Sequence, residues 1–179
     1  MTMKRMIVIV LAVFTLSGLA FGQATLSKSS SIPKIDGVIG ASEYQYSGTL
    51  AGGIKAFATL GSDGNLYLAV QAPTSGWVAA GVGGLVMNGS RLFLGAVQNG
   101  KSAFIEKAGV AHFYADAKTL VVKSWAVATS DGVTTLELCL PASDAVWKGQ
   151  INTIWAWSAS PDFTVRHKAH ASLSFTVQQ

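Results

Sequence analysis

The sequence predicts an all-β protein, an antiparallel immunoglobulin-like β-sandwich of about ten strands. Two observations carry this prediction. From residue 44 onward, short runs rich in Val, Ile, Thr and aromatic residues alternate apolar and polar side chains with a period of two. Gly, Asp, Asn and Ser separate these runs, and no stretch shows a helical period. Without helices to connect parallel neighbours, antiparallel sheets packed face to face are expected, and a closed barrel is the alternative.

The strands follow one another in order along the chain. Residues 54–60 and 66–70 form a predicted hairpin around the turn at residues 62–65. Asn99-Gly100 and Asp131-Gly132 mark two further hairpin turns, because these residue pairs readily adopt the positive φ angles that tight turns require. The other predicted strands cover residues 77–82, 91–97, 102–106, 120–128, 133–140, 151–157 and 170–177.

The N-terminal residues have the layout of a secretory signal peptide. Lys4 and Arg5 precede the apolar run of residues 6–14, and small residues follow it. A membrane anchor is the alternative, but polar and glycine residues interrupt the apolar run well short of the roughly 20 residues that a spanning helix needs. We therefore expect a periplasmic or secreted protein with no membrane span in the mature chain. The expected divisions are a signal peptide at residues 1–22, a flexible leader at 23–31 and one domain at 32–179.

Composition and motifs argue against several classes of function. The chain has 13 basic and 9 acidic residues, and two of the basic residues lie in the predicted signal peptide. The others are scattered singly, which argues against nucleic-acid binding. The single cysteine, Cys139, lies in an apolar stretch and is interpreted as a small buried side chain. The sequence contains no hydrolytic motif and no phosphate-binding glycine loop, so we expect no catalytic residues and no enzyme activity.

Candidate metal ligands are few. Met87 is the one methionine outside the predicted signal peptide. It lies in the glycine-rich segment 81–90, where it is free to point at a bound group. A gap-filling core side chain is the alternative. His167 and His170 stand near the start of the last predicted strand. Counting back by twos from its apolar positions places His167 on the core-facing side, at the rim, and His170 on the opposite side. A hydrogen-bonded structural histidine is the alternative, and His112 has less support.

Five tryptophans are a heavy load for one small domain. Indole rings fill cores, wall flat apolar cofactors or stack on sugars, and composition does not distinguish these roles. The tryptophans are Trp77, Trp125, Trp147, Trp155 and Trp157.

Several motifs, in this order and spacing, resemble the DOMON family. They are the segment from Ile35 to Tyr44, Gly76-Trp-Val-Ala-Ala-Gly81 running into Met87-Asn-Gly-Ser90, residues 131–138, Ile154-Trp-Ala-Trp157 and the closing histidine strand. The family comprises β-sandwich domains, among them the haem-binding cytochrome domain of cellobiose dehydrogenase and sugar-binding relatives. The resemblance covers most of the chain after the leader.

The resemblance implies a haem b with Met87 and His167 on the two axial positions of the iron, and Trp77 beside them in the pocket. A thioether and an imidazole would leave no open position on the iron and raise its reduction potential, so the implied work is electron transfer with a redox partner protein. The chain has no Cys-x-x-Cys-His motif, so the haem would be bound non-covalently. Arg91 stands where the family usually has Asp. His170-Ala171 replaces the customary Arg-Gly, which leaves His170 as a rival ligand.

The alternative function is a module without haem that binds carbohydrate or another small ligand through the tryptophans. In that case Asp36 and Glu43 hold a calcium ion or stabilise a turn. A plain structural or interaction domain is a third possibility. For either ligand, we expect the binding site to lie between the sheets.

Overall fold

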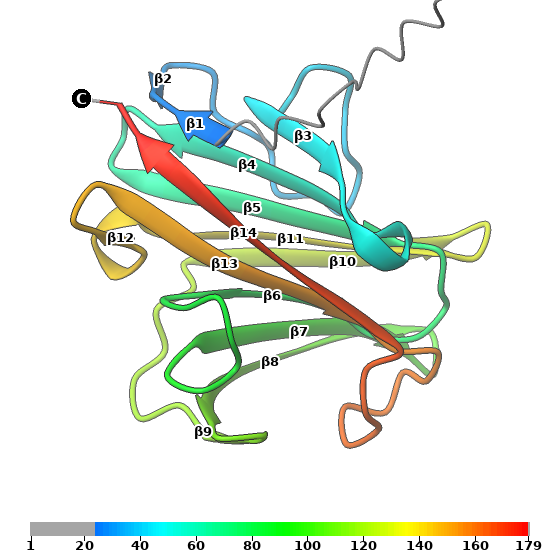
Figure 1. The fold of residues 1–179 in the computed structure, drawn as a ribbon. Coiled ribbons are helices and arrows are strands. Elements are labelled where there is room, and N and C mark those ends of the chain that lie inside the picture. The colour runs from blue at the N-terminus through cyan, green and yellow to red at the C-terminus, as the bar shows by residue number, and fades with distance from the viewer. Residues whose placement is uncertain (1–23, 179) are drawn as a thin grey trace, which may run out of the picture.

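The computed structural model describes residues 24–178, which form two β-sheets packed face to face (Figure 1). The predicted all-β sandwich is therefore confirmed. The eight-stranded sheet contains, in spatial order, β1 (Ala24–Leu26), β14 (Ala169–Val177), β13 (Gln150–Trp157), β6 (Val78–Val82), β7 (Arg91–Gln98), β8 (Lys101–Val110) and β9 (Phe113–Asp116), and β12 (Val146–Trp147) pairs with β13. The six-stranded sheet contains β10 (Ser124–Ser130), β11 (Val133–Pro141), β5 (Asn65–Ala72), β4 (Lys55–Gly61) and β2 (Lys28–Ser29), and β3 (Tyr46–Thr49) pairs with β4. Two short 3-10 turns, η1 (Ala51–Gly53) and η2 (Ala142–Asp144), complete the fold.

The predicted hairpins are present. Strands β4 and β5 pair in antiparallel register around residues 62–64, as do β7 with β8 and β10 with β11. Asn99 and Gly100 have φ angles of 51° and 74°, and Asp131 and Gly132 have 51° and 73°. Positive φ at both central residues matches the twist of the flanking strands, which explains these residue pairs at the two turns.

The prediction of a flexible leader at residues 23–31 is wrong for residues 24–29, where the structure has two strands. Residues 24–29 form β1, which pairs in parallel with β14, and β2, which pairs in parallel with β4. The physical reason is Leu26, which is fully buried in the core and whose carbonyl accepts a hydrogen bond from Gln178 N at 2.8 Å. The predicted signal peptide, residues 1–22, lies outside the described residues. Within residues 24–178, no helix is long and apolar enough to cross a membrane.

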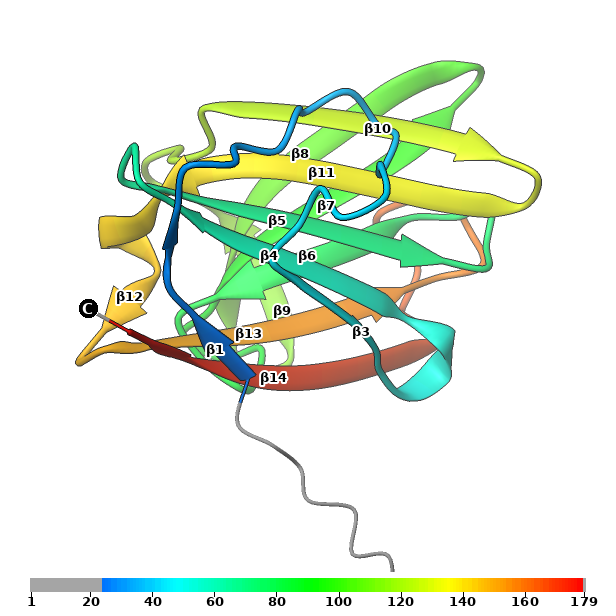
Figure 2. The same ribbon diagram turned by 90° about the horizontal axis from the view of Figure 1, so that it is seen from above.

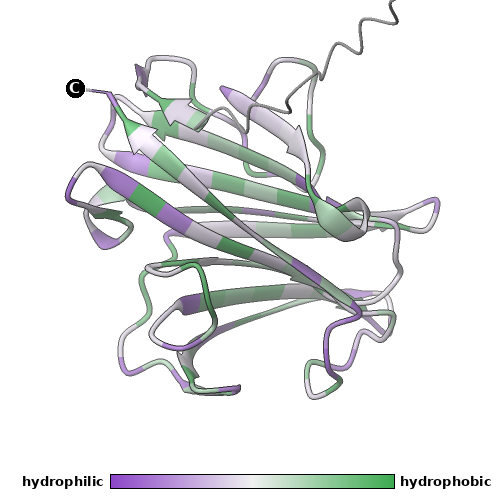
Figure 3. Ribbon diagram, viewed as in Figure 1, coloured by the Kyte–Doolittle hydropathy of each residue, from purple (hydrophilic) through white to green (hydrophobic). Residues whose placement is uncertain are grey.

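The main core lies between the two sheets. Figure 3 shows the alternating hydropathy along β14, whose apolar positions face this core. The apolar positions of β14 pack against this core, as the sequence pattern predicts. Trp155 and Trp157 are also buried in it, with exposed fractions of 1% and 7%, so these two rings fill the core.

A loop before β3 crosses the outer face of the six-stranded sheet (Figure 2). The fully buried carboxylate of Glu137 holds this loop by accepting hydrogen bonds from Asp36 N, Gly37 N and the Tyr44 hydroxyl at 3.1, 2.6 and 2.7 Å. Glu43 accepts from Lys34 N and Gly40 N, at 2.8 and 2.6 Å. The acidic residues of the loop therefore have the turn-stabilising role.

The same face contains Cys139 and a shallow cavity. Cys139 is buried, as predicted, and burial raises the pKa of its thiol. The cavity has a volume of about 710 Å³ and is lined by residues 39–45 of the loop, Ser47 of β3, Phe57 and Gln71. Within residues 24–178, no group of three or more His, Cys, Asp or Glu side chains is arranged to hold a metal ion.

Candidate functional site

The outer face of the eight-stranded sheet carries a second apolar cluster. His170, Ala156, Ala79, Leu94 and Ile105 are cross-strand neighbours on β14, β13, β6, β7 and β8. Successive residues of a strand face opposite sides of a sheet, and the flanking residues of this row lie in the main core. The row therefore points away from the core.

The centre of this outer face is lined with small residues. Ala79 and Ala156 lie side by side, and Gly81 follows between Ile154 and Leu92. A Cβ atom at Gly81 would lie only 2.8 Å from Ile154 Cγ1, so the glycine keeps the floor low where larger neighbours approach. Larger apolar side chains surround the floor. This outer cluster consists of Trp77, Ala79, Leu92, Leu94 and Ala96, with Met87, Ile105, Tyr114, Ile154, Ala156 and Phe163 packed against them.

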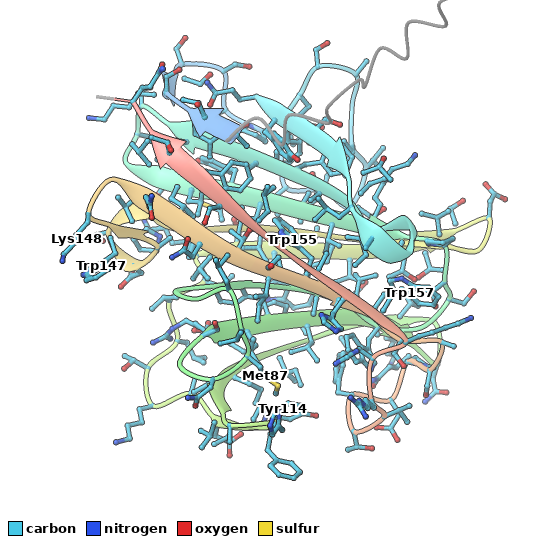
Figure 4. All side chains as sticks on the ribbon, in the orientation of Figure 1. Met87, Tyr114, Trp147, Lys148, Trp155 and Trp157 are labelled. Atoms are coloured by element: carbon cyan, nitrogen blue, oxygen red, sulfur yellow. The ribbon has the colours of Figure 1, made fainter. Side chains whose placement is uncertain are left out.

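The loop of residues 83–90 brings Met87 to this cluster. The Met87 side chain is half-buried and packs against the cluster (Figure 4). Gly89 N donates to Gly109 O at 3.0 Å, and Gly109 N donates to Ser90 O at 2.8 Å, which fastens the loop to the end of β8. Gly83 and Gly89 have φ angles of 102° and 78°, which explains the glycines of the segment.

The loop of residues 158–168 folds over the same cluster from the other end of β6. Trp77 Nε1 donates to Val165 O at 3.1 Å, and the Tyr114 hydroxyl donates to Phe163 O. Trp77 N donates to Ser160 O at 3.0 Å and Ser158 N donates to Trp77 O at 2.9 Å, which fixes the start of the loop. Phe163 itself packs against the cluster, so the loop covers part of the apolar face.

His167 does not lie where the strand pattern placed it. Strand β14 begins at Ala169, so counting by twos does not extend to His167, which belongs to the preceding loop. Its half-buried ring meets the ring of His170 edge to face, with centroids 4.9 Å apart. Because His170 neighbours Ala156 on the outer face, the histidine pair lies at the edge of the cluster.

The electrostatic setting of His167 favours a neutral imidazole. Burial lowers the pKa of His167, and the positive charges of His170 and Arg166 lower it further. A neutral ring can use a nitrogen lone pair to bind a metal.

The structure thus brings Trp77 and Met87 into one cluster and places the two histidines at its border. Met87 and Trp77 do not line the space between the sheets, where the ligand was expected, because Trp155 and Trp157 fill that space and Met87 packs on the opposite face of the sheet. A thioether and a neutral imidazole are one of the ligand pairs that haem iron takes, and an apolar floor suits the macrocycle, so the residue types of this face match that cofactor.

Comparison with known proteins defines the fold. No protein-family model matches the sequence, and no curated protein matches it. The solved cytochrome b domain of pyranose dehydrogenase from Coprinopsis cinerea superimposes with a TM-score of 0.55 and 15% identity, over 70% of this chain and 77% of that one. This chain has the fold of a cytochrome domain. The cytochrome domain of Myriococcum thermophilum cellobiose dehydrogenase superimposes with a TM-score of 0.53 and 13% identity, over 71% and 76% of the two chains. The resemblance drawn from the sequence motifs is therefore confirmed for the fold.

Arg91, which departs from the family pattern, does not face the outer cluster of this cytochrome-domain fold. It alternates along β7 with Leu92 and shares the inward side of Phe93. Its Nη1 donates to Glu106 Oε1 at 2.6 Å, and the Glu106 carboxylate also accepts from Val121 N and Val122 N. Arg91 therefore forms an ion pair with Glu106 on the core-facing side of the sheet.

The remaining candidates lie at the surface. His112 is exposed in the turn between β8 and β9. Trp125 is 40% exposed and stacks on Phe104, with centroids 5.0 Å apart. Trp147 is 69% exposed, and Lys148 Nζ lies 4.4 Å from its ring centroid (Figure 4). These indoles do not contribute to the outer cluster.

Tyr114 and Phe163 belong to the cluster but were not predicted from the sequence. Strand β9 has the sequence Phe-Tyr-Ala-Asp, which does not alternate apolar and polar residues, so no side could be assigned to Tyr114. Phe163 lies in a loop, where no periodicity applies.

Proposed function

We propose that this chain is an exported haem b-binding domain that transfers single electrons, with Met87 and His167 as axial ligands of the iron and Trp77 in the pocket wall. The observation that carries the proposal is the convergence of two loops on one apolar face. One loop contains Met87, the single methionine outside the predicted signal peptide, and the other loop contains His167. The cytochrome-domain fold supports the same function.

Haem b bound at this face would supply a one-electron iron couple, and Met/His ligation raises the potential of such a couple. The residues of the chain hold and shield the group. Met87 offers a thioether from one loop, while burial keeps the His167 imidazole neutral and able to bind. The apolar floor around Ala79 and Ala156 excludes water. Because Met87 and His167 would both bind the iron, we propose no catalytic residue and no substrate chemistry.

The proposal includes an exported location and a protein partner. Residues 1–22 are proposed to be a cleaved signal peptide, which would deliver one domain to the periplasm or the medium. That domain would begin before residue 32, because β1 and β2 belong to the sheets. Its partner would be a redox protein that docks beside the two loops.

The test is an absorption spectrum of the purified protein after addition of haemin, in oxidised and dithionite-reduced forms. The expected result is a low-spin six-coordinate spectrum. Met87→Ala should convert it to a five-coordinate or mixed spectrum and lower the reduction potential. Val127→Ala, which removes apolar atoms from the main core and leaves the outer cluster intact, should keep the wild-type spectrum. A wild-type protein that takes up no haemin contradicts the proposal.

Carbohydrate binding is the second candidate, and one observation favours it. Trp147 presents 69% of its surface to solvent at the β12–β13 turn, which is the exposure that stacking on a sugar ring requires. Retention of the wild-type protein on insoluble polysaccharides, lost in Trp147→Ala and kept in Trp155→Phe, would support this function. If haemin is not taken up and this retention is seen, the carbohydrate function replaces the haem function.

A further inference from the structure

We infer that the hairpin of β8 and β9 is the brace that fixes the two proposed ligand loops relative to each other. In this brace, Gly109 is a positioning residue for the Met87 loop and Tyr114 is a positioning residue for the His167 loop. The inference rests on the proposed function, because it concerns how the two iron ligands are held at the right separation.

The Met87 loop sits directly on Gly109. A Cβ atom built at Gly109 would lie 1.8 Å from Met87 O and 3.2 Å from Ser90 O. No side chain fits in that space, so the close approach of the loop to β8 depends on glycine. Backbone hydrogen bonds between Gly109 and both Gly89 and Ser90 hold the loop in this position. Asn88 Oδ1 adds a bond by accepting from Ala111 N at 2.9 Å.

The His167 loop is tied to the same hairpin through Tyr114. The ring of Tyr114 packs against the outer cluster, and its hydroxyl donates to Phe163 O. Trp77 Nε1 donates to Val165 O from the floor, two residues before His167. The segment that precedes His167 is thus held by two aromatic side chains, one from β9 and one from the residue before β6.

Gly109 and Tyr114 are direct cross-strand partners. One cross-strand pair in the hairpin therefore contacts both loops: Gly109 contacts the Met87 loop, and Tyr114 contacts the His167 loop. The loops leave the sheet at opposite ends of β6. A rigid link between them is what a pair of axial ligands needs, since two flexible loops would hold the iron weakly.

The test compares Gly109→Ala and Tyr114→Phe with two controls in haemin titrations, absorption and electron paramagnetic resonance spectra, and potentiometry. Tyr67→Phe removes a hydroxyl that donates to Asp63 on the other sheet. Gly95→Ala crowds Val127 and Leu136 on the core side, so it strains β7 without touching either loop.

Gly109→Ala should displace Met87, which removes the low-spin signature and lowers the reduction potential. Tyr114→Phe should weaken haemin binding by about ten-fold or more, the usual consequence of losing support for a metal ligand. The two controls should keep the wild-type spectrum and potential, whatever their stability.

The failures are distinguishable. A wild-type protein that binds no haemin overturns the proposed function and this inference with it. A wild-type protein with a six-coordinate spectrum, together with Tyr114→Phe and Gly109→Ala variants of unchanged affinity and potential, overturns the inference alone. If Gly109→Ala does not fold, Tyr114→Phe decides, because its ring still fills the same volume.

Discussion

The rings of His167 and His170 meet edge to face, with centroids 4.9 Å apart and planes inclined at 70°. One ring comes from the loop over the outer cluster and the other from β14, in register with Ala156. The half-buried His167 is more shielded than the exposed His170. Both imidazoles lie at the border of the outer cluster, so spectra of variants at each position are needed to tell which one binds the iron.

We predict that His167→Ala abolishes the low-spin spectrum of the haemin-loaded protein, whereas His170→Ala preserves it. The reason is that burial holds the His167 ring neutral and in place, while the His170 ring is open to solvent. Absorption and electron paramagnetic resonance spectra of both variants check the prediction. The reverse pattern would assign the iron to His170.

The titration of His167 gives a second prediction. Burial disfavours the imidazolium and lowers the pKa of His167 from its ordinary value, and the charge of His170 lowers it further. His170→Ala should therefore move the His167 midpoint upward in an NMR titration, while burial continues to lower it. The folded state binds this proton less readily than the unfolded chain, so protonation of His167 destabilises the fold as the pH falls below about 6.5. An unchanged midpoint in His170→Ala would show that the two rings are not coupled.

The sequence was most informative where one face of a strand packs against the core along its whole length. Strand β14 alternates apolar and polar residues over nine positions, and its inward side was predicted correctly. The hairpin turns at Asn99-Gly100 and Asp131-Gly132 were predicted because their backbone conformation selects those residues. Long periodic strands and tight turns can therefore be predicted from the residues of the segment itself.

The candidate site could be predicted only in part, because its geometry is not local. Met87 and Trp77 were selected by residue type and setting, but the face on which they meet follows from the sheet order. A sequence pattern shows which residues of β6 face opposite sides, and it does not show which side is covered by the other sheet. The same limitation applied to β1 and β2, whose pairing depends on distant strands.

Glu137 provides a stability prediction that is independent of the site. Its buried carboxylate accepts hydrogen bonds from two backbone amides and the Tyr44 hydroxyl. In Glu137→Gln the amide NH₂ group faces a donor, so we expect a loss of about 3 kcal/mol in the free energy of unfolding. Urea denaturation measures this loss. Glu43→Gln, at a half-buried carboxylate with two backbone donors, is the matched control and should cost less than about 1 kcal/mol.

Arg91 gives the last prediction, because it stands where the related domains usually carry an aspartate. The Glu106 side chain is 2% exposed, and Arg91 lies 2.6 Å from its Oε1. Arg91→Asp introduces the residue that the DOMON resemblance implies at this position and places a second carboxylate beside a buried one, so we expect a loss of about 3 kcal/mol in the free energy of unfolding. Arg91→Leu removes the cation without adding a like charge and should cost less. Since Arg91 faces away from the outer cluster, the haemin spectrum of either folded variant should match that of the wild type. A changed spectrum in Arg91→Leu would mean that this position acts on the haem site from the far side of β7.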